Sequence, residues 1–293
     1  MVKILLLLVV AVNGLYAARF FADFLKHKEE AMAEPGNNVF LAIWGAVVFF
    51  LSTFGISDFA LSTVVYRARK LLEDKKLPGT LNTQCAIPVA VMALAYISAI
   101  SVEPKTLVLL IVAQMIGAYF GPRFVVRMPV TRIRLFMGVG LILAAFFVVA
   151  GKFNLIPSGG EAIGLTGGKL ALAIGLMIVY GALNNVGIGS YAPTMATVYA
   201  LGLNPAVAFP VMMGACTFSV PVGASEFVRL GQYGRKITLF SSIFGIVGVL
   251  AAVYIVKSLN VSMLQWVVAA VVLYSGTSLL KGAMASEAVK QEA

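Results

Sequence analysis

The chain has 293 residues, of which 60% are hydrophobic and only 12% are charged, whereas soluble domains carry about 25% charged residues. No soluble core uses that much apolar surface, so the composition excludes a soluble globular protein. The net charge of +10 does not indicate nucleic-acid binding, because the Lys and Arg residues lie in short clusters between apolar runs, as in loops that face the cytoplasm.

The long apolar runs predict membrane-spanning helices. A helix of about 20 apolar residues crosses the hydrocarbon core, and unpaired backbone is not tolerated there. The sequence therefore predicts an all-α integral membrane protein with about nine spans, two of them interrupted by glycine and polar residues. The predicted spans are 2–24, 39–66 (interrupted), 80–101, 104–122, 132–151, 169–200 (interrupted), 205–225, 237–256 and 261–280.

The first span also resembles a signal peptide, because Lys3 precedes an apolar stretch. No cleavage pattern of small residues stands out near Tyr16, and the apolar character continues through Phe20. We therefore expect this helix to be retained.

Basic residues set the expected orientation. The loops at 67–76 and 123–134 are the most basic, so both should be cytoplasmic, and counting spans backwards places the N-terminus in the cytoplasm. The basic loop that contains Arg229 and Lys236 then falls outside. Either that loop is an exception or one interrupted segment is re-entrant.

The two interruptions resemble each other. Residues 55–62 (GISDFALS) align with residues 187–194 (GIGSYAPT), and the same register sets two four-span blocks in parallel. An even number of crossings per block makes the two repeats parallel, whereas re-entrant hairpins would make them inverted. The predicted divisions are an additional N-terminal helix and outer loop at 1–38, a first repeat at 39–151, a linker at 152–167, a second repeat at 168–281 and a polar tail at 282–293.

A break in a membrane helix frees backbone N–H and C=O groups, and in transporters such breaks line the substrate site. In the second break Gly187 and Gly189 permit close backbone approach, and the start of the next half-helix attracts an anion. The alternative is a kink that packs tightly against a neighbouring helix. The predicted substrate-binding residues are Gly55, Ser57, Asp58, Ser62, Asn82, Gln84, Asn185, Gly187, Gly189, Ser190, Tyr191 and Thr194.

Asp58 places a carboxylate inside a span, which indicates a function. It either binds a coupling proton or sodium ion or forms a structural pair with a basic residue such as Arg67. Asn82 and Gln84 either contact substrate or join helices by hydrogen bonds. Cys85 and Cys216 lie in apolar segments, which suits neither a disulfide framework nor a zinc site, and no cofactor is expected.

With these motifs the chain resembles the sulfite exporter TauE/SafE family, also described as toluene sulfonate uptake permeases. The resemblance covers most of residues 39–281 and also rests on residues 117–130 (GAYFGPRFVVRMPV), which are similar to the family's segment between adjacent spans. It implies transport of small, commonly sulfur-containing anions across a bacterial cytoplasmic membrane. The first motif departs from the family, because Ser57 and Asp58 stand where members often have glycine, which makes ion coupling or another substrate more plausible.

A secondary transporter of small sulfur-containing anions, acting through a central site between two broken helices, is therefore the leading hypothesis. The alternatives are a transporter of another small solute or cation and a membrane scaffold subunit that transports nothing. An intramembrane enzyme is disfavoured, because the sequence offers no metal or nucleophile motif at membrane depth and its single histidine, His27, lies in a polar loop.

Overall fold

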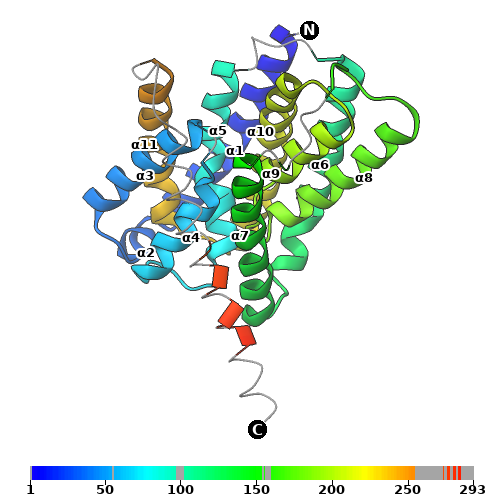
Figure 1. The fold of residues 1–293 in the computed structure, drawn as a ribbon. Helices are drawn as coiled ribbons and strands as arrows, with labels where there is room; N and C mark the ends of the chain where they lie inside the picture. The colour runs from blue at the N-terminus through cyan, green and yellow to red at the C-terminus, as the bar shows by residue number, and fades with distance from the viewer. Residues whose placement is uncertain are drawn as a thin grey trace.

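The computed structural model describes residues 2–54, 56–96, 102–153, 155 and 160–254, and seven positions between 273 and 284. The fold of these residues is all α, apart from one isolated bridge between Ala162 and Leu203 (Figure 1). The helices with continuous bounds are α1 (Val2–Lys26), α2 (Lys28–Ala33), α3 (Asn38–Thr53), α4 (Asp58–Ala68), α5 (Leu77–Tyr96), α6 (Pro104–Val125), α7 (Val130–Lys152), α8 (Gly167–Asn184), α9 (Tyr191–Ala200), α10 (Pro205–Leu230) and α11 (Arg235–Tyr254).

Six of these helices, α1, α5, α6, α8, α10 and α11, contain a stretch long and apolar enough to cross a membrane. This confirms the expected all-helical protein with several candidate spans. The predicted last span, 261–280, falls mostly outside the described residues.

Many of the helix ends gather on a face that we call the basic face. There Arg235 at the start of α11 pairs with Asp23 near the end of α1 (Nε to Oδ2, 2.7 Å), and Arg134 near the start of α7 pairs with Asp74 in the loop between α4 and α5 (2.8 Å). Most of the basic side chains of the described residues lie near the helix ends on this face. They are Lys26, Lys28, Arg67, Arg69, Lys70, Lys75, Lys76, Arg123, Arg127, Arg132, Arg134, Arg229, Arg235 and Lys236.

The other helix ends meet on the opposite face. There the loop between α7 and α8 is bonded to the segments that precede α10 and α6. Asn204 N donates to Ala162 O (2.8 Å), and Glu103 N donates to Ile163 O (2.9 Å). The N-terminal end of α1 lies towards this face (Figure 1).

The two interrupted segments are helical hairpins. α3 begins on the basic face, where Lys236 Nζ donates to Gly36 O (2.8 Å), and α4 ends on the same face, where Arg67 pairs with Asp74. α8 begins beside the end of α9 on the opposite face, because Lys169 Nζ donates to Leu201 O (3.0 Å). Counting 39–66 and 169–200 as one crossing each is therefore not supported, and the re-entrant alternative describes both, because in each pair the second helix returns to the face where the first began.

Local backbone geometry produces the second turn. Gly187 and Gly189 have φ angles of 98° and 70°, in the left-handed region that favours glycine, so α8 ends before them and the chain reverses. In the first turn Ser57 caps α4 by accepting a hydrogen bond from Ala60 N (3.3 Å).

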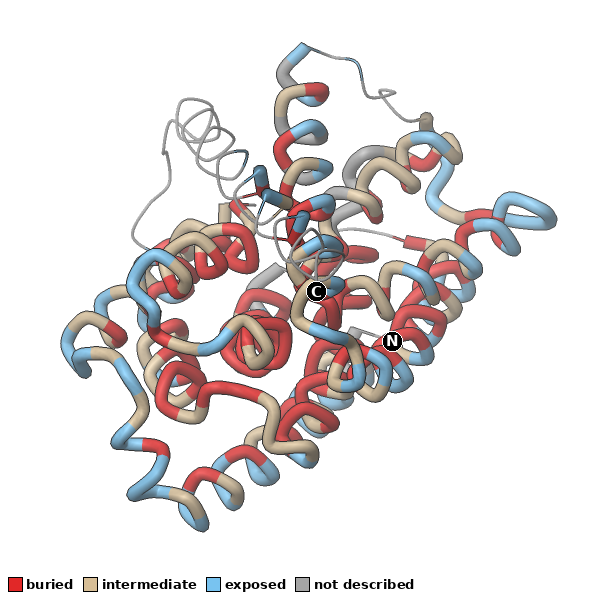
Figure 2. The backbone as a smooth tube through the Cα atoms, turned by 90° about the horizontal axis from the view of Figure 1, so that it is seen from below, coloured by how far each residue is buried: buried red, intermediate tan, exposed pale blue. Residues whose placement is uncertain are grey.

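α5 and α10 form the centre of the molecule. Within their spanning stretches 83% and 89% of the residues are buried, against 22% in α1 and 28% in α8. Seen from below, the buried residues gather in the interior and the exposed ones on the outer surfaces of the helices (Figure 2). Each hairpin contacts one of these central helices, α4 against α5 and α9 against α10, so the breaks are positioned beside the core.

Close helix packing leads to a first prediction. A Cβ on Gly181 of α8 would lie 2.1 Å from Gln114 O of α6, whereas a Cβ on Gly175, in the same helix, meets nothing within 4 Å. We expect Gly181→Ala to destabilise the protein by about 1–3 kcal/mol, because backbone must move. Gly175→Ala should be neutral or stabilise by up to about 1 kcal/mol. Thermal unfolding of both purified variants checks this, and equal midpoints would contradict the packing.

Candidate functional site

The two breaks lie next to each other in the interior. A Cβ built on Gly189 would be 3.8 Å from Ser57 Oγ, so the turn before α9 contacts the turn before α4. Tyr191 at the start of α9 packs against the same hydrophobic cluster that contains Phe59, from the first turn of α4. The N-terminal ends of α4 and α9 therefore meet between the central helices.

The start of α9 is open to an anion. Ser190 is the N-cap residue, but its side chain makes no capping hydrogen bond, and the first turn contains no acidic residue. Uncapped backbone N–H groups and the positive end of the helix dipole consequently have no negative partner within α9. A helix N-terminus with these properties binds oxyanions.

A polar cluster surrounds Ser190. Gln114 Nε2 of α6 donates to Ser190 Oγ (3.1 Å) and to Ser219 Oγ of α10 (3.0 Å), and Ser190 Oγ lies 3.1 Å from Cys216 Sγ. All four side chains are buried, and Gln114 Oε1 has no hydrogen-bond partner among the described residues. The sequence analysis missed Gln114, although an uncharged polar residue between Ala113 and Met115 in an apolar span was a signal for it.

The start of α4 carries a carboxyl group of its own. Asp58 is the first residue of α4, is 5% exposed, and accepts a hydrogen bond from Ser52 Oγ at Oδ1 (3.3 Å). Its Oδ2 is without a hydrogen-bond partner in the described part of the chain. Arg67 pairs instead with Asp74 (3.1 Å) on the basic face, so the structural pair of Asp58 with Arg67 is not formed.

Ser62 and Gln84 lie on the side of the first break that leads to the basic face. Ser62 follows Asp58 by one helical turn, and Gln84 accepts a hydrogen bond from the Tyr66 hydroxyl a further turn along α4. Both side chains are fully buried. They are close to the first hairpin and have no hydrogen bond to the second among the described residues.

Asn82 and Asn185 support the second break. The side chains of Asn82 and Asn184 bond to each other (3.0 Å), and Asn82 also donates to Asn184 O (3.2 Å). Asn185 donates to the carbonyls of Gly181 (2.8 Å) and Ala118 (3.2 Å). These contacts favour the helix-joining interpretation for both amides. The remaining predicted site residue, Gly55, lies outside the described residues.

Thr194 and Tyr191 complete the first turn of α9. Thr194 is buried and its hydroxyl contacts Met177 Sδ (3.7 Å), while the Tyr191 hydroxyl contacts Met213 Sδ (3.7 Å). Sulfur is a weak acceptor, so both hydroxyls can exchange these contacts for stronger ones to a bound anion. The described residues contain no group of three or more His, Cys, Asp or Glu side chains able to hold a metal ion.

Comparison with known proteins identifies the family. Residues 1–148 match the family model described as Sulfite exporter TauE/SafE, which covers α1, the first hairpin and most of the helices up to α7. The N-terminal helix, which we expected to be an addition to the family core, therefore lies within the match. No curated protein and no solved structure matches the chain. The chain belongs to the sulfite exporter TauE/SafE family and is a transmembrane anion transporter rather than an enzyme.

Proposed function

We propose that the protein is a secondary transporter that carries small sulfur-containing anions, such as sulfite or a sulfonate, through a central site between the two hairpins. The observation that carries this proposal is the contact between the breaks at Ser57 and Gly189. The anion binds the free N–H groups at the start of α9 together with the hydroxyls of Ser190, Tyr191 and Thr194. Neutral donors can replace the anion's water and still release it, because no fixed positive charge holds it.

Asp58 supplies the coupling site in this proposal. Its carboxylate and the anion face each other across the contact between the breaks, and two negative charges at this distance repel in a poorly hydrated interior. Uptake of a proton or sodium ion at Asp58 relieves that repulsion, so ion binding and anion binding favour each other. Transport of another solute or of a cation would not use the open N-terminus of α9 in this way.

The repeats at 39–151 and 168–281, joined by the linker 152–167, are proposed to be inverted, each beginning with one hairpin. The helix contacts support two equivalent repeats, because α3 packs on α11 as α8 packs on α6, and α5 packs on α11 as α10 packs on α6. The hairpins support the inversion, because α3 begins on the basic face and α8 on the opposite face. The alignment of the two motifs also aligns Ala46 with Ile178. The carbonyl oxygen of Ala46 in α3 packs closely against Gly248 in α11. In the same way, the carbonyl oxygen of Ile178 in α8 packs closely against Gly117 in α6.

The basic face is proposed to face the cytoplasm, in a bacterial inner membrane. Two hairpins that return to their own side bring the loop around Arg229 and Lys236 onto the same face as the other basic loops, which removes the conflict met in the sequence. Of the described basic residues, Lys3, Lys105, Lys152 and Lys169 lie at the helix ends of the opposite face. The N-terminal end of α1 then lies outside the cytoplasm, and the segment 1–38 leads to the basic face.

Cysteine labelling tests this orientation. Lys70 and Gly168 are exposed on the basic and opposite faces, and the native cysteines are buried. In intact cells we expect a membrane-impermeant maleimide to label Gly168→Cys and to label Lys70→Cys only after the membrane is opened. Labelling of Lys70→Cys from outside would contradict the orientation.

A transport assay tests the function. Purified protein is reconstituted into sealed liposomes, and movement of radiolabelled sulfite is followed with and without imposed pH and sodium gradients. We expect sulfite movement that a gradient accelerates. Turnover of a substrate in detergent without a sealed compartment, or no movement of sulfite, thiosulfate, sulfoacetate or taurine, would contradict the proposal.

A further inference from the structure

A stripe of polar side chains runs along one buried face of α4. Asp58, Ser62 and Tyr66 follow one another at intervals of four residues, which places them on the same side of the helix. Their exposed fractions are 5%, 0% and 0%. The stripe leads from the break towards the basic face, where α4 ends and Arg67 pairs with Asp74.

Several polar atoms along this stripe lack a protein partner. The Tyr66 hydroxyl donates to Gln84 Oε1, and Ser62, Ser241 and Trp44 lie close around the same hydroxyl. Nevertheless, hydrogen-bond partners within the described residues are missing for four buried atoms, which are Trp44 Nε1, Asp58 Oδ2, Ser62 Oγ and Gln84 Nε2. Buried polar atoms in native proteins are almost always satisfied, and water fills the role when protein does not. The stripe is thus suited to hold a file of bound water.

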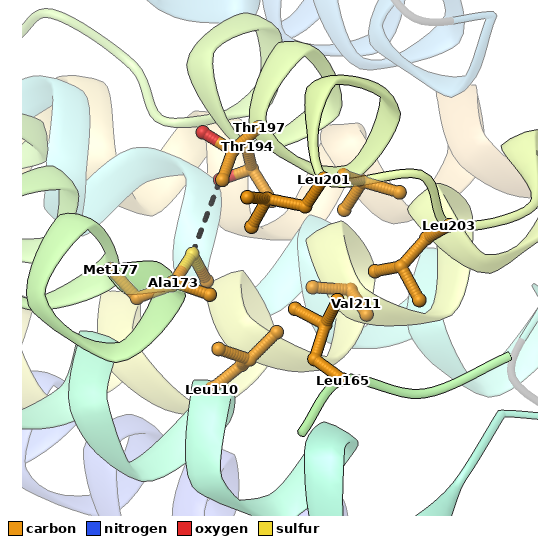
Figure 3. A pocket seen from close by; sticks show the side chains of 10 residues that line it. Leu110, Leu165, Ala173, Met177, Thr194, Thr197, Leu201, Leu203 and Val211 are labelled. Atoms are coloured by element: carbon orange, nitrogen blue, oxygen red, sulfur yellow. Dashed lines mark hydrogen bonds between the residues drawn. The ribbon is translucent and has the colours of Figure 1, made fainter. Parts of the chain in front are cut away.

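The second hairpin lacks such a stripe. The positions of α9 that align with Asp58, Ser62 and Tyr66 are Ser190, Thr194 and Val198, so the series ends in an apolar residue. Next to Thr194 there is a cavity of about 10 Å³, and Figure 3 shows the Thr194 side chain directed across it to Met177. Apolar side chains line most of the cavity. They are those of Leu110, Leu165, Ala173, Met177, Val198, Leu201, Leu203 and Val211.

This cavity is unsuited to water. An apolar cavity stays dry unless it offers a water molecule about two to four polar partners. The only hydroxyls in its lining are those of Thr194 and Thr197. Thr194 already contacts Met177, and Thr197 Oγ1 already donates to Pro193 O (2.9 Å). The cavity beside α9, on the side of the break that leads to the opposite face, is therefore dry.

No positively charged side chain of the described residues neutralises Asp58. The titratable side chains that interact with it electrostatically are Tyr66 of α4, Cys85 of α5, Tyr191 of α9 and Cys216 of α10. None of them carries a positive charge at any pH. Asp58 forms no ion pair with a Lys, Arg or His side chain of the described residues.

We infer that Asp58 exchanges a proton with the solution at the basic face through a file of water and hydroxyl groups along α4, past Ser62 and Tyr66, while the apolar cavity beside α9 closes the opposite side. Each group in the file accepts a proton from one neighbour and passes one to the next. The net change is protonation of the Asp58 carboxylate by a proton from the basic face, with no other bond altered. The inference rests on the proposed transport function and selects the proton over the sodium ion.

Two fluxes measured in liposomes test this. Proton movement that accompanies net sulfite transport is followed with the trapped dye pyranine, and exchange of labelled for unlabelled sulfite is followed at equal pH on both sides. Exchange moves a loaded carrier back and forth and needs no proton release. Tyr66→Phe keeps the ring and removes the hydroxyl, while Ser62→Ala removes the next hydroxyl in the file. Thr63→Val is the matched control, because the Thr63 hydroxyl is bonded to Phe59 O (2.7 Å) in its own helix.

We expect Tyr66→Phe and Ser62→Ala each to slow the proton movement about tenfold, the effect of one lost hydrogen bond of about 1.4 kcal/mol in the transfer path. Tyr66→Phe should leave sulfite exchange unchanged, and Thr63→Val should change neither flux. Wild-type proton movement in both stripe variants would overturn the file. Net transport driven by sodium without proton movement would overturn the choice of the proton. Absence of sulfite exchange in the wild type would instead overturn the proposed function itself.

Discussion

Gly189→Leu should weaken sulfite binding at least a hundredfold without unfolding the protein. Gly189 has a φ of 70°, so any other residue strains the turn that presents the start of α9. A Cβ alone has room, since its nearest neighbour would be Ser57 Oγ at 3.8 Å, but the remaining leucine atoms must enter the space between the two breaks. The anion then loses its backbone N–H donors, and hydrogen bonds to a charged group contribute about 1.5–3 kcal/mol each.

The loss of two such bonds corresponds to affinity at least a hundredfold weaker, since each 1.4 kcal/mol is about tenfold. Equilibrium binding of radiolabelled sulfite to purified protein measures it, with thermal unfolding as the check on folding. Gly175→Leu is the matched control, because Gly175 is an exposed position of the same hairpin with nothing within 4 Å of its Cβ. If the folded Gly189→Leu variant binds sulfite with wild-type affinity, the anion site does not lie between the breaks.

Asp58→Asn should uncouple anion movement from the ion gradient. The amide has nearly the shape of the carboxylate and keeps an acceptor for Ser52, but it neither takes up a proton nor attracts a cation. With the charge removed, the repulsion between Asp58 and the anion is also gone. We expect gradient-driven accumulation of sulfite to fall at least tenfold, about 1.4 kcal/mol of coupling free energy or more, while sulfite exchange continues.

The measurement compares accumulation with and without an imposed gradient in sealed liposomes. Asp58→Glu, which keeps the charge, should retain part of the gradient response. Glu161→Gln removes an exposed carboxylate on the opposite face and should have no effect. If Asp58→Asn accumulates sulfite as the wild type does, Asp58 is not the coupling group.

The sequence predicted the helices well but not the course of the interrupted ones. Apolar runs and the two glycine motifs located α1, both breaks and the helices that follow them within a few residues. Hydrophobicity does not distinguish a helix pair that crosses the membrane from one that turns back, because both bury apolar surface in the same medium. The misplaced basic loop at Arg229 and Lys236 was the one signal in the sequence for the hairpins.

The candidate site was only partly accessible from sequence. Glycine and serine at 187–190 indicated the second break, because backbone that reverses inside a membrane needs those residues. Gln114 could not be placed, since it is a single polar residue whose partners, Ser190 and Ser219, lie far away in the chain. Ser52 was missed although its partner Asp58 is only six residues away. Asn82 and Asn185 have the residue type of a substrate ligand, yet their hydrogen bonds join α5, α6 and α8.

Movement of radiolabelled sulfite across sealed liposomes that contain only this protein tests the central claim most directly. The account predicts that wild-type protein moves sulfite, that an opposing or parallel proton gradient changes the extent of accumulation, and that Gly189→Leu reduces the movement to the level of empty liposomes. Sulfite movement that is equal in wild type and Gly189→Leu, with both proteins folded, would contradict a central anion site between the two hairpins.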